Sequence, residues 1–403
     1  MDFSISGLFH TAMVRALPIL ALLAATACTT TEVRTTAFTP LTVEDATIAE
    51  NRLLDVGVVQ FNPGLDRVEA GEDTLVFPEL RQAESRYVAV KLSEALQSSQ
   101  GWGAVRVIPS IRTNIDVTVT GVIVQSDGET LTLDITVTDS RGQRWFSKRY
   151  SEHASHYAYD RKHPTKGDAF QGIYNNVAND MLAYRRKLSN RQIAELRTIS
   201  EIKFARSFSP HAFDRYLSRS KDGIYRLTAL PAENDPMLNR VRRIRERDYL
   251  FVDTLQGYYG TFVKSMEKPY QEWRALSYEE VKQMRELKRK ARNHTILGAA
   301  AIIGGIAAAG SGAGSARAAG QVGIAGGGYL IKSGFDRRSE AKMHMEALLE
   351  LGDSMQAEVE PQIVELEDRT VTLTGTVENQ YRQWRELLRE IYQAETGALG
   401  TQI

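Results

Sequence analysis

Three consecutive segments in which apolar and polar residues alternate constrain the fold more than any other feature of the sequence. They span residues 115–125, 130–138 and 143–150, and Asp127-Gly128 separates the first from the second. Alternation at period two is typical of half-buried strands, and Asp-Gly between two such runs is typical of a β-hairpin. The sequence therefore predicts a three-stranded antiparallel meander.

The segments around this meander predict the rest of an α+β domain over residues 50–188. Apolar runs at Leu53–Phe61 and Ala104–Ile108 predict two further strands. Apolar residues at helical spacing predict helices over Glu79–Gln97 and across Phe170–Leu182. One mixed sheet with two helices on one face would satisfy both periodicities, so an α+β fold is expected.

The chain contains a single cysteine, Cys28, which excludes a fold held by internal disulfides. Arg15 precedes a short apolar stretch, Ala16–Ala25, and Ala25-Thr26-Ala27 places small residues directly before the cysteine. The stretch is too short to span a bilayer, which needs about 20 apolar residues. This order is typical of a secretory signal.

The segment resembles the lipobox of bacterial lipoproteins, although Ala25 stands where that family usually has leucine. The resemblance implies cleavage after residue 27 and acylation of Cys28, which would bind membrane lipid. Thr29 is not the aspartate that retains enterobacterial lipoproteins in the inner membrane, so the resemblance favours a periplasm-facing position on the outer membrane. Residues 28–49 read as a flexible tether. The alternative is an ordinary cleaved signal followed by an incidental cysteine.

The order of elements, the size of the α+β domain and the lipoprotein signal together resemble the N-terminal domain of TolB and the related curli-secretion and penicillin-binding-protein-activator lipoproteins. The resemblance covers about a third of the chain and is topological. It implies a non-enzymatic periplasmic module that binds envelope protein partners, and it supplies no catalytic residues.

Residues 189–295 show helical periodicity and almost no strand pattern. Helices are predicted over Arg191–Phe204, Leu238–Phe262 and Tyr278–Arg292. A basic cluster, Arg240–Arg247, could contact acidic lipid headgroups or polysaccharide. Because Glu246 and Asp248 lie among these arginines, a solvated helix face is the favoured interpretation.

Residues 296–335 are rich in glycine and alanine, and small residues recur there every four positions. Such stripes allow close helix packing in a bilayer, and the segment resembles the glycine-zipper regions of envelope proteins. Three interpretations stay open: two short membrane-inserted helices near 295–309 and 321–333, homo-oligomerisation or buried packing, and a plain linker. The residues expected to contact a membrane or a second copy are Ala301, Gly304, Gly305, Ala308, Ala309 and Gly312.

The C-terminal part, residues 336–403, predicts a helix over Ser339–Val359, a β-hairpin formed by Ile363–Leu366 and Thr370–Val377, and a last amphipathic helix across Tyr381–Tyr392. A lone two-stranded hairpin is marginally stable in water. We therefore expect it to pack on the helical region or to extend the sheet of the first domain.

The sequence carries little sign of catalytic chemistry. Fifty basic and fifty acidic residues give a formal net charge of zero, which argues against nucleic acid as a partner. No nucleotide, hydrolase or zinc-protease motif is present, so no cofactor and no metal are predicted. His153, His156 and His163 lie near Asp160 and Asp168, and an alternative hypothesis makes them the site of an enzyme that acts on envelope glycan or peptide.

The sequence thus favours a non-enzymatic, lipid-anchored outer-membrane lipoprotein that acts in envelope assembly, transport or partner binding. A homo-oligomeric channel component is a further alternative.

Overall fold

The computed structural model describes residues 38–67, 78–109, 114–159, 167–232, 234–308, 350, 361–366 and 369–396. All of them belong to one compact unit, Ala37–Ile403. Several predictions fall outside the described residues: the signal and Cys28, residues 309–335 of the Gly/Ala segment with Ala309 and Gly312 among them, and all of the helix 339–359 except Glu350.

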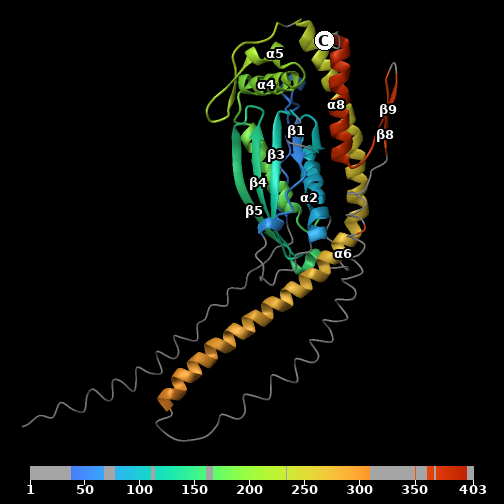
Figure 1. Cartoon of the computed structure of the whole chain (residues 1–403). Helices are drawn as coiled ribbons and strands as arrows, with labels where there is room; N and C mark the ends of the chain where they lie inside the picture. The colour runs from blue at the N-terminus through green and yellow to red at the C-terminus, as the bar shows by residue number, and fades with distance from the viewer. Residues whose placement is uncertain are drawn as a thin grey trace, which may run out of the picture. The chain divides into compact units, whose positions relative to one another are not determined.

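A mixed five-stranded sheet forms the centre of the fold, which is α+β as the sequence predicts (Figure 1). The meander prediction is confirmed, since β3, β4 and β5 pair antiparallel in succession. β1 lies between β2 and β3 and is parallel to both. The sheet order is β2-β1-β3-β4-β5. The strands are β1 (Val56–Val59), β2 (Val105–Ile108), β3 (Val117–Ser126), β4 (Thr130–Asp139) and β5 (Arg144–His153).

Two helices, α2 (Pro78–Ser98) and α3 (Gln171–Arg185), cover one face of this sheet. Alternate residues of β3 and β4, such as Val119 and Ile135, are fully buried beneath them. Their neighbours Thr120 and Thr136 lie on the opposite face and are only partly buried. Burial of one face explains the alternation that the sequence shows.

Helix α4 (Asn190–Phe208) follows, and it begins with a capping box in which Ser189 and Gln192 satisfy each other's backbone N–H groups. A short helix α5 (Pro210–Phe213) leads to a small hairpin, β6 (Leu217–Arg219) and β7 (Tyr225–Leu227). The sequence did not predict these strands, because three residues are too few to show a period. Short 3-10 helices occupy Glu50–Arg52, Leu65–Arg67, His156–Tyr159 and Asp214–Tyr216.

Helix α6 (Pro236–Ala308) is a single helix of 73 residues, about 110 Å of helical rise. The helices predicted over 238–262 and 278–292 are thus confirmed as helical, but they are parts of one helix, and the interpretation that begins a new helix near 295 is wrong. Pro269 lies inside α6 and removes one helical hydrogen bond, whose acceptor would be the carbonyl of the exposed Ser265. The buried residues directly after it, Tyr270, Trp273 and Arg274, fix the helix by tertiary packing.

The C-terminal elements are β8 (Gln362–Glu365), β9 (Thr370–Leu373) and α8 (Val377–Thr396). The hairpin β8–β9 forms a sheet of its own and does not extend the five-stranded sheet. It packs on the helical region, because Gln362 donates a hydrogen bond to Tyr258 of α6 at 2.5 Å. Helix α8 lies along α6, with Trp384 stacked on Phe251 at a centroid distance of 4.9 Å (Figure 1).

Helix α6 also covers the β2 edge of the sheet. The Gln256 side chain accepts a hydrogen bond from the Val107 N–H and donates one to the Val107 carbonyl, both at 2.9 Å. Beside it, Arg106 of β2 pairs with Asp253 of α6 at 2.5 Å. An open strand edge is a template for unwanted pairing, and here a glutamine amide takes the place of a neighbouring strand.

Candidate functional site

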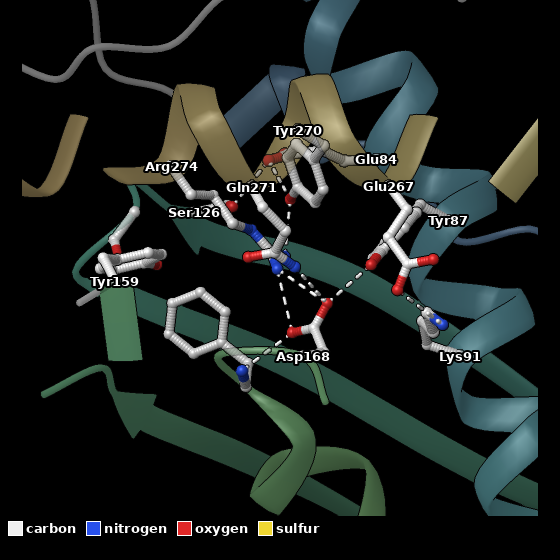
Figure 2. Close-up of polar contacts among 12 residues, drawn as sticks. Glu84, Tyr87, Lys91, Ser126, Tyr159, Asp168, Glu267, Tyr270, Gln271 and Arg274 are labelled. Carbon is white, nitrogen blue, oxygen red and sulfur yellow. Dashed lines mark hydrogen bonds and ion pairs between the residues drawn. The ribbon is translucent and has the colours of Figure 1, made fainter. Parts of the chain in front are cut away.

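A fully buried ion pair joins α6 to the α+β domain. Arg274 of α6 is 0% exposed, and its Nη1 donates to both carboxylate oxygens of Asp168 at 2.9 Å. Asp168 precedes α3 and also accepts hydrogen bonds from the Tyr87 hydroxyl at 2.8 Å and from the Gln271 amide at 3.2 Å. Figure 2 shows these side chains converging from α2, α6 and the segment before α3. We call this group, together with Glu84 and Tyr270, the junction cluster.

The junction cluster continues through Tyr270 to α2. Nη2 of Arg274 donates to the Tyr270 hydroxyl at 2.8 Å, and this hydroxyl donates to Glu84 at 2.6 Å. Glu84 also accepts from Ser126 at 2.8 Å (Figure 2). It pairs with Arg81 at 3.1 Å. A chain of donors and acceptors thus connects α6, α2 and the end of β3.

Charge balance keeps the buried pair ionised. Burial by itself would raise the pKa of Asp168, but the charge of Arg274 and the hydrogen bonds from Phe170 and Tyr87 hold it below its ordinary value. Burial would likewise lower the pKa of Arg274, and the charge of Asp168 instead raises it well above the ordinary value. The Arg274 guanidinium also lies 3.8 Å from the centre of the Tyr270 ring, a cation–π contact.

The turn between β3 and β4 provides the surface on which this part of α6 rests. Ser277 donates to the Asp127 carbonyl at 2.7 Å. Gly128 has a positive φ of 77°, and a Cβ there would lie 2.4 Å from the Arg274 carbonyl oxygen. The Asp127-Gly128 pair, recognisable in the sequence as a hairpin turn, therefore also allows the close approach of α6.

The ion pair at the centre of the junction cluster is buried, and this limits the chemistry that Asp168 can perform. A carboxylate that is 3% exposed as a residue and holds four hydrogen-bond donors cannot reach a substrate. Asp168, one of the carboxylates named in the enzyme hypothesis, thus has a structural role. His153, also part of that hypothesis, bonds Thr130 through Nδ1 at 2.9 Å. Asp160 and His163 lie outside the described residues, as does the side chain of His156.

A second polar group lies where α4 and α6 meet the start of β3. Ser200 donates to the Asp116 carboxylate and accepts from Arg245 at 3.0 Å. Burial raises the pKa of Asp116 although Arg245 opposes it. A pocket of about 630 Å³ adjoins these residues. Ser200 itself is 0% exposed, and in the described part of the chain no histidine hydrogen-bonds to it, so the group does not form a hydrolase triad.

The uncovered face of the sheet carries a shallow groove of about 730 Å³. Its polar side chains are paired with each other: Asp134 accepts two hydrogen bonds from Arg149, and Thr136 bonds Ser147. Among the described residues, no group of three or more histidine, cysteine or carboxylate side chains could hold a metal ion.

The residues predicted to contact a membrane or a second copy are only partly described. Ala301, Gly304, Gly305 and Ala308 lie on the last turns of α6, one turn apart in two pairs. No helix in the described ranges is both long enough and apolar enough to cross a membrane. Of the predicted basic cluster, Arg242 pairs with Glu201 at 2.7 Å, and Arg247 and Arg240 lie 3.4 and 3.9 Å from Glu395. These arginines thus bond mainly within the protein.

The sequence offered no signal for most of the junction cluster. Arg274 and Asp168 are 106 residues apart, and neither belongs to a recognisable motif. The one available sign was a set of aromatic and charged residues directly after Pro269. An exposed helix would not carry such an aromatic cluster, so these residues indicate burial.

Comparison with known proteins adds no further assignment: no protein-family model, no curated protein and no solved structure matches this chain.

Proposed function

We propose that the protein is a non-enzymatic lipoprotein, anchored through acylated Cys28 to the periplasmic side of the outer membrane, where it binds envelope protein partners. The observation that carries this proposal is the place of the only cysteine, directly after Ala25-Thr26-Ala27 and a short apolar stretch. Several acyl chains on one residue suffice for stable anchoring, since each buried methylene contributes about 0.8 kcal/mol.

The path of the N-terminal segment supports an anchor close to the folded body. The Thr39 carbonyl accepts from Asn175 in α3 at 2.8 Å, and Glu44 pairs with Arg186 after the end of α3 at 3.0 Å. The second half of the predicted tether is thus bonded to the domain. Phe38 follows Cys28 by ten positions, so an anchor at Cys28 would hold the body within about 35 Å of the bilayer.

The position of α6 supports a second contact with lipid or with another copy of the chain. This contact would lie at the same end of the domain as Thr39. Arg242 bonds Glu201 in α4, whereas Arg274 and Ser277 bond Asp168 and the β3–β4 turn at the other end of the sheet. The helix continues past that turn to Ala308. We propose that its Gly/Ala segment contacts lipid or a second copy of the chain there, and light scattering in detergent distinguishes the two.

Radiolabelled palmitate tests the anchor. In a bacterial host, the wild-type chain should incorporate the label and fractionate with the outer membrane, whereas Cys28→Ala should incorporate none. A replacement of Thr29 by Ala serves as the control and should be labelled normally. Label retained in Cys28→Ala, or a wild-type chain that stays soluble after cell breakage, would refute the proposal.

A further inference from the structure

The region from α4 to β7 concentrates positive charge in a chain whose net charge is zero. Residues 203–228 hold six lysines and arginines and two aspartates. Their charges cannot be recognised as one group in the sequence, because they are spread over a helix, a 3-10 helix and a hairpin. We call them the basic patch: Lys203, Arg206, Arg215, Arg219, Lys221 and Arg226.

Three of these cations converge on one aromatic ring. Lys203 Nζ lies 5.0 Å from the centre of the Tyr225 ring, and the guanidinium carbons of Arg219 and Arg206 lie 5.4 and 5.8 Å from it. Arg206 pairs with Asp214 at 2.7 Å. Lys203 and Arg219 donate instead to backbone carbonyls, those of Ser140 and Gly223. One carboxylate among three cations leaves an excess of positive charge.

The electrostatics of Lys203 agree with this geometry. Burial lowers the pKa of Lys203, Asp139 raises it, and the charges of Arg219 and Arg206 lower it again. Asp139 is itself engaged by Arg141 at 2.7 Å and by the Trp145 indole N–H at 3.2 Å. The neighbouring Arg215, Lys221 and Arg226 are exposed. An external anion near Tyr225 would relieve repulsion that the protein leaves uncompensated.

The patch lies at the opposite end of the sheet from the proposed membrane contacts. Tyr225 donates its backbone N–H to the carbonyl of Arg141, in the turn between β4 and β5, at 2.8 Å. At the far end of β5, Glu152 accepts from the Ile173 N–H in the first turn of α3 at 2.6 Å. The strand between them spans about 35 Å. Thr39 and Ser277 both form hydrogen bonds at this second end of the sheet, near the first turn of α3.

We propose that the basic patch binds a carboxylate-rich segment of a partner protein in the periplasm. Arginine side chains recognise carboxylates through paired hydrogen bonds, and an exposed cation cluster speeds the approach of an acidic partner. This choice rests on the proposed function. With Cys28 acylated, the anchored end of the molecule lies about one strand length from the basic patch, which favours protein carboxylates over lipid headgroups as its ligand. The exposed Arg219 and Lys221 provide the first contacts.

Labelled poly-L-glutamate, titrated against the purified full chain in detergent, tests the site by fluorescence anisotropy. The wild-type chain should bind it with an affinity that falls as salt rises. Arg219→Glu/Lys221→Glu should weaken binding by about tenfold or more. The matched control Lys264→Glu/Lys268→Glu reverses two exposed cations on α6, and its affinity should stay within about twofold of wild type.

Two further measurements separate loss of binding from loss of folding and protein carboxylates from lipid. Should the reversal disturb folding, as judged by the thermal unfolding midpoint, Arg219→Gln/Lys221→Gln replaces it and should still weaken binding. Equal losses in the patch and control variants would overturn the proposal, as would binding of phosphatidylglycerol vesicles through Arg219 and Lys221 in preference to poly-L-glutamate. Because this assay does not require acylation, its failure is distinct from a failure of palmitate labelling.

Discussion

At the scale of single residues, the buried pair Asp168–Arg274 shows how a charge can be essential without being catalytic. Arg274→Met would leave the Asp168 carboxylate buried without its counterion. Removal of one partner from such a pair costs about 3–5 kcal/mol. The free energy of unfolding, measured by urea titration, should fall by that amount.

A double substitution completes this test. Asp168→Leu/Arg274→Met removes both charges, so its free energy of unfolding should lie closer to wild type than that of Arg274→Met. The exposed pair Asp134–Arg149 provides the control, and Arg149→Met should shift the unfolding midpoint little. A double variant no more stable than the single one would contradict the role assigned to the pair.

Glu152 gives the protein a pH-dependent stability. Burial raises its pKa to about 7, the hydrogen bond from the Ile173 N–H lowers it, and the charge of Asp168 raises it. Gly172 makes the approach possible, since a Cβ at that position would lie 2.3 Å from a Glu152 oxygen.

The raised pKa of Glu152 determines the direction in which stability changes with pH. The folded state binds the Glu152 proton more tightly than the unfolded chain, whose value is near 4.5. Stability should therefore rise as the pH falls through 7 toward 4.5, by about 2 kcal/mol from this group. Glu152→Gln should flatten the pH dependence of the urea midpoint between pH 8 and pH 5. An unchanged slope would show that Glu152 titrates normally.

At the scale of elements, the sequence predicted best where one face of an element is buried. The strands β3–β5 and the helices α2, α3 and α8 all lie where periodicity placed them. For α6, periodicity predicted the helical segments but not their continuity, which depends on the tertiary packing of Tyr270, Trp273 and Arg274 directly after Pro269. The prediction failed for β6–β7, whose short strands carry no period.

The β2 edge offers a test of how α6 and the sheet support each other. Gln256→Leu would leave the Val107 N–H and carbonyl without hydrogen bonds, which should cost about 2 kcal/mol in unfolding free energy. Hydrogen exchange should become faster at Val105–Ile108. Thr254→Ala, on the exposed face of the same helix, is the control and should change neither quantity. Unchanged exchange at β2 would mean that Gln256 does not protect this edge.

At the scale of the whole molecule, the sequence predicted an α+β fold, and the structure shows one. The order of the sheet could not be predicted, because the insertion of β1 between β2 and β3 depends on contacts between distant residues. The same holds for the junction cluster, whose members come from α2, α6 and the segment before α3. The hydrophobic core runs through both the sheet domain and the helices that follow it, from Leu54 to Tyr392.

Because α6 is unbroken, the number of residues between two positions determines the angle between them around the helix axis. Each residue of an α-helix advances the chain by 1.5 Å and turns it by about 100°. Between Arg274, which is buried in the domain, and Ala301, the rotation of the backbone about the helix axis is therefore fixed by the number of residues. A single inserted residue would rotate the helix beyond the insertion by more than a quarter turn about its axis. Seven inserted residues would return it to nearly its original angle.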